Sequence, residues 1–356
     1  MTRACWCGHD TLEPFTDGYR VCRQCETLVS TFEHPTDVSR VTADESDLYG
    51  RNYWFGHMEN DLGFTNIYER ANTDLADRCL FWLETLLKYK TPPGRTLELG
   101  CAHGGFVAML QWAGFTATGL ELSPAISQIA RDLFGVEALA GAIDEQRIAP
   151  GTCDVIVMMD VLEHLPDPVG TMRHCVELLK PDGMLLIQTP CFPEGASMPS
   201  LQAEHSRFGE VLQPQEHLYL FSRRSVGQLF AELDCGHVTF EPALFAHYDM
   251  FLAVSRVPLA AIRASERIRS LAATPTGRLV AASLGLSERL RAEQQRYAQA
   301  DDDRVKRLAA IETLTAQLLE SEADRAARLE VIHDADAHIA QLTSKLRKRK
   351  RLRKRR

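Results

Sequence analysis

The chain has 356 residues, of which 45% are hydrophobic, so it can form one sizeable core with appendages. The start, MTRACWCGHD, does not resemble a signal peptide, and no apolar run approaches the roughly 18 residues of a membrane span. These features predict a soluble cytoplasmic protein whose ten cysteines are reduced or metal-bound rather than paired in disulfides. The net charge is −8, but ten of the last twelve residues are Lys or Arg, so the body is strongly acidic.

Composition divides the chain into six segments. In chain order we expect a cysteine-rich module (residues 1–40), a helical lead-in (41–94), an α/β core (95–256), a helical linker (257–285), a coiled-coil helix (286–346) and a basic tail (347–356). Within the lead-in, the aromatic stretch DLYGRNYWFGH precedes an amphipathic helix over about residues 66–90, which ends at Pro92-Pro93-Gly94.

The first segment holds two cysteine pairs about fifteen residues apart, Cys5-x-Cys7 and Cys22-x-x-Cys25. The second pair has the standard spacing of a zinc knuckle, and the first is one residue shorter, so His9 could replace a cysteine ligand. We therefore expect a zinc-ribbon-like module with a structural Zn²⁺, since four protein ligands leave no open coordination position. The alternative is four free buried thiols.

The third segment alternates short apolar runs with helical patterns, which predicts a mostly parallel sheet covered by helices on both faces. The expected helices are 105–113, 123–134, 168–179 and 222–233. The expected strands are 95–99, 116–120, 136–139, 154–159, 184–189, 237–241 and 250–255. In such sheets ligands bind beyond the carboxyl ends of the strands.

The stretch LELGCAHGG ends the first strand of this segment and leads into a helix. Gly100 and Gly104 permit positive φ and close approach of the backbone to a ligand, whereas Glu98 would repel the pyrophosphate of a dinucleotide. The second strand ends at Glu121, whose carboxylate can accept both hydroxyls of a ribose, and the fourth ends at Asp160. This pattern favours a cationic, ribose-containing ligand.

The four stretches LELGCAHGG, GLELS, MMDVLEHLPDP and LLKPDGMLLIQTP resemble, in order and spacing, the motifs of class I S-adenosylmethionine (SAM) methyltransferases. The resemblance implies a Rossmann-like, seven-stranded, doubly wound core. It also implies roles for individual residues. Glu98 would orient the loop and the methionine amino group, Glu121 would hold the ribose, and the other residues beside SAM would be Gly100, Ala102, Gly104, Leu122, Ala142, Ile143, Asp160 and Val161.

The stretch QEHLYLFS, between the fifth strand and the next helix, is similar to a segment of methyltransferases that act on sugars, several of which carry an N-terminal zinc module. By this resemblance His217 is the candidate base, with Glu216 and Tyr219 beside it, unless His217 merely hydrogen-bonds the loop. His164 is the second candidate base. Tyr49, Tyr53 and Trp54 would close over SAM or the acceptor, or would dock the zinc module on the core.

After Val305, apolar residues recur at intervals of three and four as far as Leu346, interrupted by Glu322, Arg325 and Asp336. This pattern predicts a partial coiled coil for self-association or a partner helix, the alternative being a single exposed helix. The basic tail suits an anionic membrane surface on the cytoplasmic side. Nucleic acid is not expected, because no aromatic residues interleave with the basic ones.

The leading interpretation is a SAM-dependent methyltransferase that acts on a nucleotide sugar or a surface glycan. Two alternatives remain open at this point. One is an O-methyltransferase of a small aromatic or quinone precursor, as in ubiquinone-biosynthesis relatives, and the other is a non-catalytic coiled-coil scaffold with a methyltransferase fold.

Overall fold

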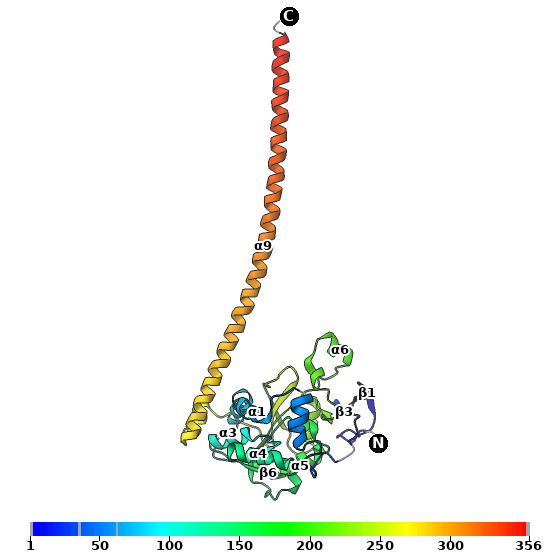
Figure 1. The fold of residues 1–356 in the computed structure, drawn as a ribbon, viewed down its shortest axis with the longest axis vertical. Coiled ribbons are helices and arrows are strands. Elements are labelled where there is room, and N and C mark those ends of the chain that lie inside the picture. Colours follow the sequence, from blue (N-terminus) through cyan, green and yellow to red (C-terminus); the bar gives the residue numbers. More distant parts are fainter. Residues whose placement is uncertain (1–2, 35–36, 62, 354–356) are drawn as a thin grey trace. The chain divides into compact units, whose positions relative to one another are not determined.

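The computed structural model describes residues 3–34, 37–61 and 63–353. Contacts between residues divide the chain into two units, Met1–Ser287 and Glu288–Arg356, which are treated separately below. The first unit contains every strand of the described chain, and the second consists of most of one long helix (Figure 1).

A mixed sheet of seven strands forms the centre of the first unit. Its order is β10-β11-β8-β7-β4-β5-β6, and only β11 runs antiparallel to its neighbours. The strands are β4 (Arg95–Leu99), β5 (Thr116–Glu121), β6 (Glu137–Ala140), β7 (Cys153–Met159), β8 (Leu179–Pro190), β10 (His237–Glu241) and β11 (Asp249–Ser255). The predicted Rossmann-like methyltransferase core is therefore confirmed, and strand order reverses beside β4, between β5 and β7.

Helices cover both faces of this sheet because the central strands are apolar on both sides. One face packs on α2 (Leu80–Leu87), α3 (Gly105–Ala113) and α4 (Pro124–Phe134), and the other on α5 (Pro168–Leu178) and α7 (Arg223–Ala231). Local signals fix the helix ends. The Ser123 hydroxyl accepts the Ile126 N–H at 3.1 Å, Pro124 occupies the first turn, and Gly135 ends α4 with a φ of +65°.

The lead-in differs from the single helix predicted over residues 66–90. It consists of the π-helix η1 (Tyr53–Asp61), α1 (Ile67–Asp74), a π-helical turn η2 (Leu75–Cys79) and α2. In the turn, the Leu80 N–H donates to the Leu75 carbonyl, five residues back. Such a wide turn within a helix is frequently found at functional sites.

Residues 12–30 form a second, antiparallel sheet of β1 (Leu12–Pro14), β2 (Tyr19–Cys22) and β3 (Thr27–Ser30). Its fourth strand, β9 (Tyr219–Leu220), comes from the QEHLYLFS stretch, nearly 190 residues later. The cysteine-rich segment thus shares both a sheet and a hydrophobic cluster with the core. The remaining short elements are η3 (Ile143–Glu145), η4 (Leu162–His164), α6 (Met198–Ala203), η5 (Arg207–Val211) and α8 (Ala264–Leu271).

The last helix, α9 (Pro275–Arg353), contains 79 residues. Near its start Val280 is buried against the core, but the apolar residues from Leu286 onwards are largely exposed. No helix in the described part of the chain is long and apolar enough to cross a membrane. Of the predicted basic tail, residues 354–356 lie outside the described residues.

Candidate active site

A cavity of about 890 Å³ opens at the carboxyl ends of β4, β5 and β7. It brings together residues from all four core motifs, from the aromatic stretch of the lead-in and from QEHLYLFS. The predicted site residues on its wall are Glu98, Gly100, Ala102, Glu121, Leu122, Ala142, Ile143, Asp160, Val161, Glu216 and His217, and Tyr49, Tyr53, Trp54 and His164 also line it.

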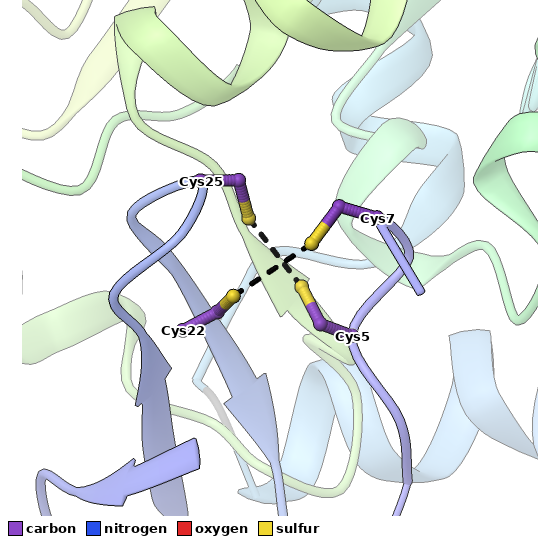
Figure 2. Close-up of side chains that lie close together, drawn as sticks. All are labelled: Cys5, Cys7, Cys22 and Cys25. Carbon is purple, nitrogen blue, oxygen red and sulfur yellow. Dashed lines mark hydrogen bonds between the residues drawn. The ribbon is translucent and has the colours of Figure 1, made fainter. Parts of the chain in front are cut away.

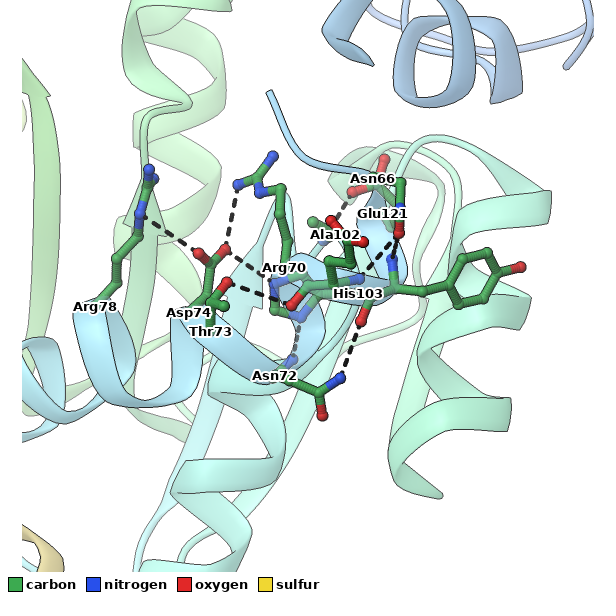
Figure 3. Close-up of polar contacts among 12 residues, drawn as sticks. Asn66, Arg70, Asn72, Thr73, Asp74, Arg78, Ala102, His103 and Glu121 are labelled. Atoms are coloured by element: carbon green, nitrogen blue, oxygen red, sulfur yellow. Dashed lines mark hydrogen bonds and ion pairs between the residues drawn. The ribbon is translucent and has the colours of Figure 1, made fainter. Parts of the chain in front are cut away.

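The glycine loop has the backbone shape that its sequence predicts. Gly100 has a φ of +68°, and a Cβ at this position would lie 2.7 Å from a methyl group of Val161. Ala102 also takes a positive φ, of +46°, and its N–H donates to Glu121 Oε2 at 3.0 Å (Figure 3). This bond ties the loop after β4 to the end of β5.

Two buried carboxyl groups face this loop. Glu98 is 4% exposed, and its Oε2 has no hydrogen-bond partner among the described residues. Burial raises the pKa of Glu98 well above its usual range, and the nearby Glu121 raises it further. Burial likewise raises the pKa of Glu121 to about 7, although N–H groups of Ala102 and Ser123 favour its charged form. A buried acidic pair with an unpaired oxygen suits a cationic ligand.

Gly104 does not line the cavity, which corrects its predicted place beside SAM. It precedes the first residue of α3 with a φ of +81°, and a Cβ there would lie 2.9 Å from the Cβ of Ala130 on α4. Gly104 therefore allows α3 and α4 to pack closely, and its influence on the loop is indirect.

Asp160 lies at the end of β7 with a φ of +58°. Its Oδ1 accepts the Gln188 side-chain N–H at 3.0 Å, and Gln188 in turn accepts the Trp82 indole N–H at 3.0 Å. This buried chain holds the Asp160 carboxyl on the cavity wall, where the resemblance placed the methionyl end of SAM.

Sequence reasoning missed a group of charged residues on the lead-in helices. Asp74 lies between the guanidinium groups of Arg70 (3.3 Å) and Arg78 (3.7 Å), and His103 of the glycine loop approaches the same carboxylate at 3.1 Å (Figure 3). All four line the cavity, and Arg70 keeps one buried nitrogen, Nη1, without a partner among the described residues. The spacing of 70, 74 and 78, with charges on one helix face, was the available signal.

His217 is buried, and its orientation is fixed by the backbone. Its Nδ1 lies 2.7 Å from the Val211 carbonyl, so this nitrogen carries the proton and Nε2 keeps a free lone pair. Burial lowers the pKa of His217, which favours the neutral imidazole. These properties suit a base.

His164 lies beside His217, with 4.9 Å between the ring centroids. Its Nδ1 is 3.0 Å from both the Glu216 carbonyl oxygen and the Tyr49 hydroxyl. Burial, reinforced by His217, lowers the pKa of His164 to about 3, so this ring is neutral as well.

Glu216 is buried and held by the lead-in. Its Oε2 accepts the Tyr53 hydroxyl at 2.9 Å, and its Oε1 lies 2.6 Å from Nε2 of His57, a residue that sequence reasoning did not identify. Tyr53 and Glu216 are thus in contact, as expected for an aromatic segment that closes over the site.

Tyr219 points away from the cavity, which corrects its predicted catalytic position. It belongs to β9, and its hydroxyl donates to the Ala4 carbonyl at 3.1 Å. Because side chains alternate along a strand, Tyr219 packs on the cysteine-rich module, two residues after His217.

The four predicted metal ligands converge (Figure 2). The Sγ–Sγ distances are 3.4 Å for Cys5–Cys25 and 3.7 Å for Cys7–Cys22, close to the roughly 3.8 Å edge of a ZnS₄ tetrahedron with 2.3 Å bonds. The short first pair fits because a tight turn follows it, with the Gly8 N–H donating to the Cys5 carbonyl and a φ of +78° at Gly8. His9 is not part of the cluster, and these residues can hold zinc as four thiolates.

A second group with metal-ligand chemistry lies in the cavity itself. Ligand atoms of Glu163, His164 and His217 all lie within 4.8 Å of one another. The Thr189 hydroxyl donates to Glu163 Oε2 at 2.9 Å. This arrangement is compatible with direct action on an acceptor and with a cation.

Comparisons with known proteins identify the class of this domain. Residues 70–238 match the family model described as "Methyltransferase domain". The domain belongs to the class I SAM-dependent methyltransferases, as its sheet order and the four motifs indicate.

Among individual proteins, the chain is similar to ubiquinone biosynthesis O-methyltransferases. It is 32% identical to the one from Xanthomonas campestris pv. campestris (strain B100) over 105 residues, which are 28% of this chain and 44% of the relative. It is 35% identical to that of Ralstonia nicotianae over 103 residues, 27% and 42% of the two chains. The match thus spans less than half the length of these relatives. Among solved structures, phosphoethanolamine N-methyltransferase 2 of Haemonchus contortus aligns with a TM-score of 0.44 and 15% identity, covering 58% of this chain and 60% of that one.

Proposed function

We propose that the protein transfers a methyl group from SAM to a small polar acceptor in the described cavity, with His217 as general base. The observation that carries the proposal is the meeting, on one cavity wall, of the glycine loop with its buried acidic pair and a neutral histidine with a free Nε2. The part of the cavity near Glu98 and Glu121 fits the cofactor, and the part near His217 remains for an acceptor.

The residues near β4 and β5 match the chemistry of SAM. The unpaired Oε2 of Glu98 can accept an ammonium proton, Glu121 can accept ribose hydroxyls, and the bare Cα of Gly100 leaves room for the ligand. SAM supplies a methyl group on a sulfonium centre, which is already activated for displacement. The protein then mainly aligns the acceptor and removes its proton.

The acceptor proton would pass to Nε2 of His217. The Val211 carbonyl keeps Nδ1 protonated, so the imidazole becomes a cation stabilised by hydrogen bonding at Nδ1 and by the neighbouring Glu216 carboxylate. Tyr53 and His57 fix Glu216 in turn, which ties the position of the base to closure of the lead-in.

For the acceptor class, we propose a hydroxyl-rich molecule such as a sugar. The wall near His217 carries the buried polar groups of Glu163, Asp249 and Glu216, which need hydrogen-bond partners that an acceptor with several hydroxyls supplies. The second candidate is a phenolic or quinone precursor. The names of the relatives favour it, and so do the rings of Trp54, Phe64 and Phe245 on the same cavity wall.

The test is methyl transfer from labelled SAM to a panel of nucleotide sugars, oligosaccharides and catechols. We expect transfer to a sugar, a loss of about 10²–10⁴-fold in kcat for His217→Asn, and an unchanged Kd for SAM. His205→Asn is the matched control, because His205 is exposed and does not line the cavity. Transfer to catechols alone would assign the second candidate, and failure to bind SAM would indicate a non-catalytic scaffold.

We also propose that Cys5, Cys7, Cys22 and Cys25 hold one structural zinc ion. The convergence of four thiols without a disulfide supports this proposal. Elemental analysis of the purified protein should give about one zinc per chain, and a chain purified without metal from zinc-supplemented culture would contradict it.

A further inference from the structure

The exposed part of α9 carries a heptad repeat that runs without a shift from Leu290 to Leu346. With positions labelled a to g, the d positions are Leu290, Tyr297, Arg304, Ile311, Leu318, Arg325, Ile332, Ile339 and Leu346, and the a positions are Gln294, Asp301, Leu308, Thr315, Glu322, Leu329, Asp336 and Thr343. All the apolar residues at d and a in this stretch are at least 47% exposed. The helix therefore presents an apolar seam along its length, broken by charged residues.

The charged residues of the seam come in two pairs of the same composition. Asp301 and Arg304 form one pair, and Glu322 and Arg325 form the other. In a parallel, in-register dimer each of these four residues would face its own copy, which would place four like-charge contacts in the core. Such contacts are destabilising.

An antiparallel dimer resolves all four contacts in one register. In antiparallel coiled coils a positions of one helix face d positions of the other, and in this register the numbers of facing residues add to 626. Arg304 then faces Glu322 of the second copy, and Arg325 faces Asp301. Because the arrangement has two-fold symmetry, each of these ion pairs occurs twice.

The same register also pairs the apolar positions near the centre. Leu318 faces Leu308, Leu329 faces Tyr297, and Ile311 faces Thr315. Shifting the antiparallel register by one heptad in either direction separates the charges, since Arg304 would then face Thr315 or Leu329. Charge complementarity therefore selects one occupant, one direction and one register.

We propose that the exposed seam of α9 binds the same helix of a second copy of this chain, antiparallel, centred between residues 311 and 315. The overlap from Leu290 to Asp336 covers about 70 Å at 1.5 Å per residue. Each member then has opposite charge or apolar surface opposite almost every core position, which neither the isolated helix nor a parallel pair provides. This association does not depend on the proposed methyl transfer.

The test uses the full chain and sedimentation velocity, with circular dichroism to verify that helix content is kept. We expect a dimer for the wild type and for the charge swap Arg304→Glu with Glu322→Arg. Each single substitution should weaken the dimer by about a hundredfold or more, because it creates the like-charge contact twice. Lys306→Glu is the matched control, since Lys306 lies at an f position away from the seam and should leave the dimer unchanged.

Direction is tested separately by energy transfer between fluorophores ligated to the C-termini of a mixed donor and acceptor population. The antiparallel dimer predicts no transfer above that of monomers. A monomeric wild type, a single substitution without effect, a swap that fails to restore the dimer, or efficient transfer between C-termini would each overturn the proposal.

Discussion

SAM binding should weaken as the pH falls through neutrality, and Glu121 is the group responsible. Its carboxyl is buried at the end of β5, which raises its pKa to about 7. Only the ionised form offers a full negative charge to the ribose hydroxyls. Since the raised pKa belongs to an acid, the binding-competent form predominates above pH 7 and is lost below it.

The size of the effect follows from this pKa. The apparent Kd increases by the factor 1 + 10^(pKa − pH), which is about 1.1 at pH 8 and about 11 at pH 6. The affinity for SAM should therefore fall about tenfold between these values. Binding at pH 7 should release about half a proton from Glu121.

Isothermal titration calorimetry at pH 6, 7 and 8, in buffers of different ionisation enthalpy, measures both quantities. Glu121→Gln should bind SAM about 10–100-fold more weakly at pH 8, as expected for the loss of charged hydrogen bonds. Its remaining pH dependence gives the baseline set by the amino group of SAM itself. Glu204→Gln, at an exposed position, is the matched control. A wild-type Kd that stays within twofold over this range, or a glutamine variant with the wild-type pH dependence, would refute the reasoning.

Three further predictions concern other parts of the site. Gly100→Ala should cost about 1–2 kcal/mol for the left-handed backbone and lower the affinity for SAM about 5–30-fold by calorimetry; Val161→Ala in the same chain should restore part of it, because it removes the 2.7 Å contact. Cys22→Ser should abolish zinc binding in elemental analysis and lower Tm by at least about 5 °C, whereas Cys175→Ser, a buried cysteine outside the cluster, should keep the zinc. Tyr53→Phe should reduce kcat/KM for the acceptor about fivefold, near 1 kcal/mol, with an unchanged Kd for SAM; an equal loss in both would mean that Tyr53 supports the cofactor instead.

The core was predictable because each of its strands is a short apolar run bounded by turn residues. Arg95–Leu99 and His237–Glu241 were predicted with their observed bounds, and the other five strands with small differences at their ends. The glycine loop was predictable for a related reason, since Gly100 occupies a backbone conformation that few other residues adopt.

The errors concern side-chain direction and contacts between distant parts of the chain. Tyr219 looked catalytic because it follows Glu216 and His217, but strand alternation turns it toward Ala4. Gly104 resembled a ligand contact, yet its conformation serves helix packing. Arg78 and His57 reach the cavity only because the π-helical segments orient them, and a helical pattern in the sequence does not distinguish these segments from an α-helix.

The pairing of β3 with β9 has a consequence for how the chain is made. A ribosome releases residues 12–30 long before residue 219, so the small sheet can gain its fourth strand only after most of the methyltransferase core has been synthesised. Closing a loop of this length slows folding much more than it reduces final stability. The Tyr19 hydroxyl donates to the backbone carbonyl of His217 at 3.0 Å, and this contact forms in the same late step. During biosynthesis, the catalytic segment should therefore be among the last parts of the enzyme to reach its working position.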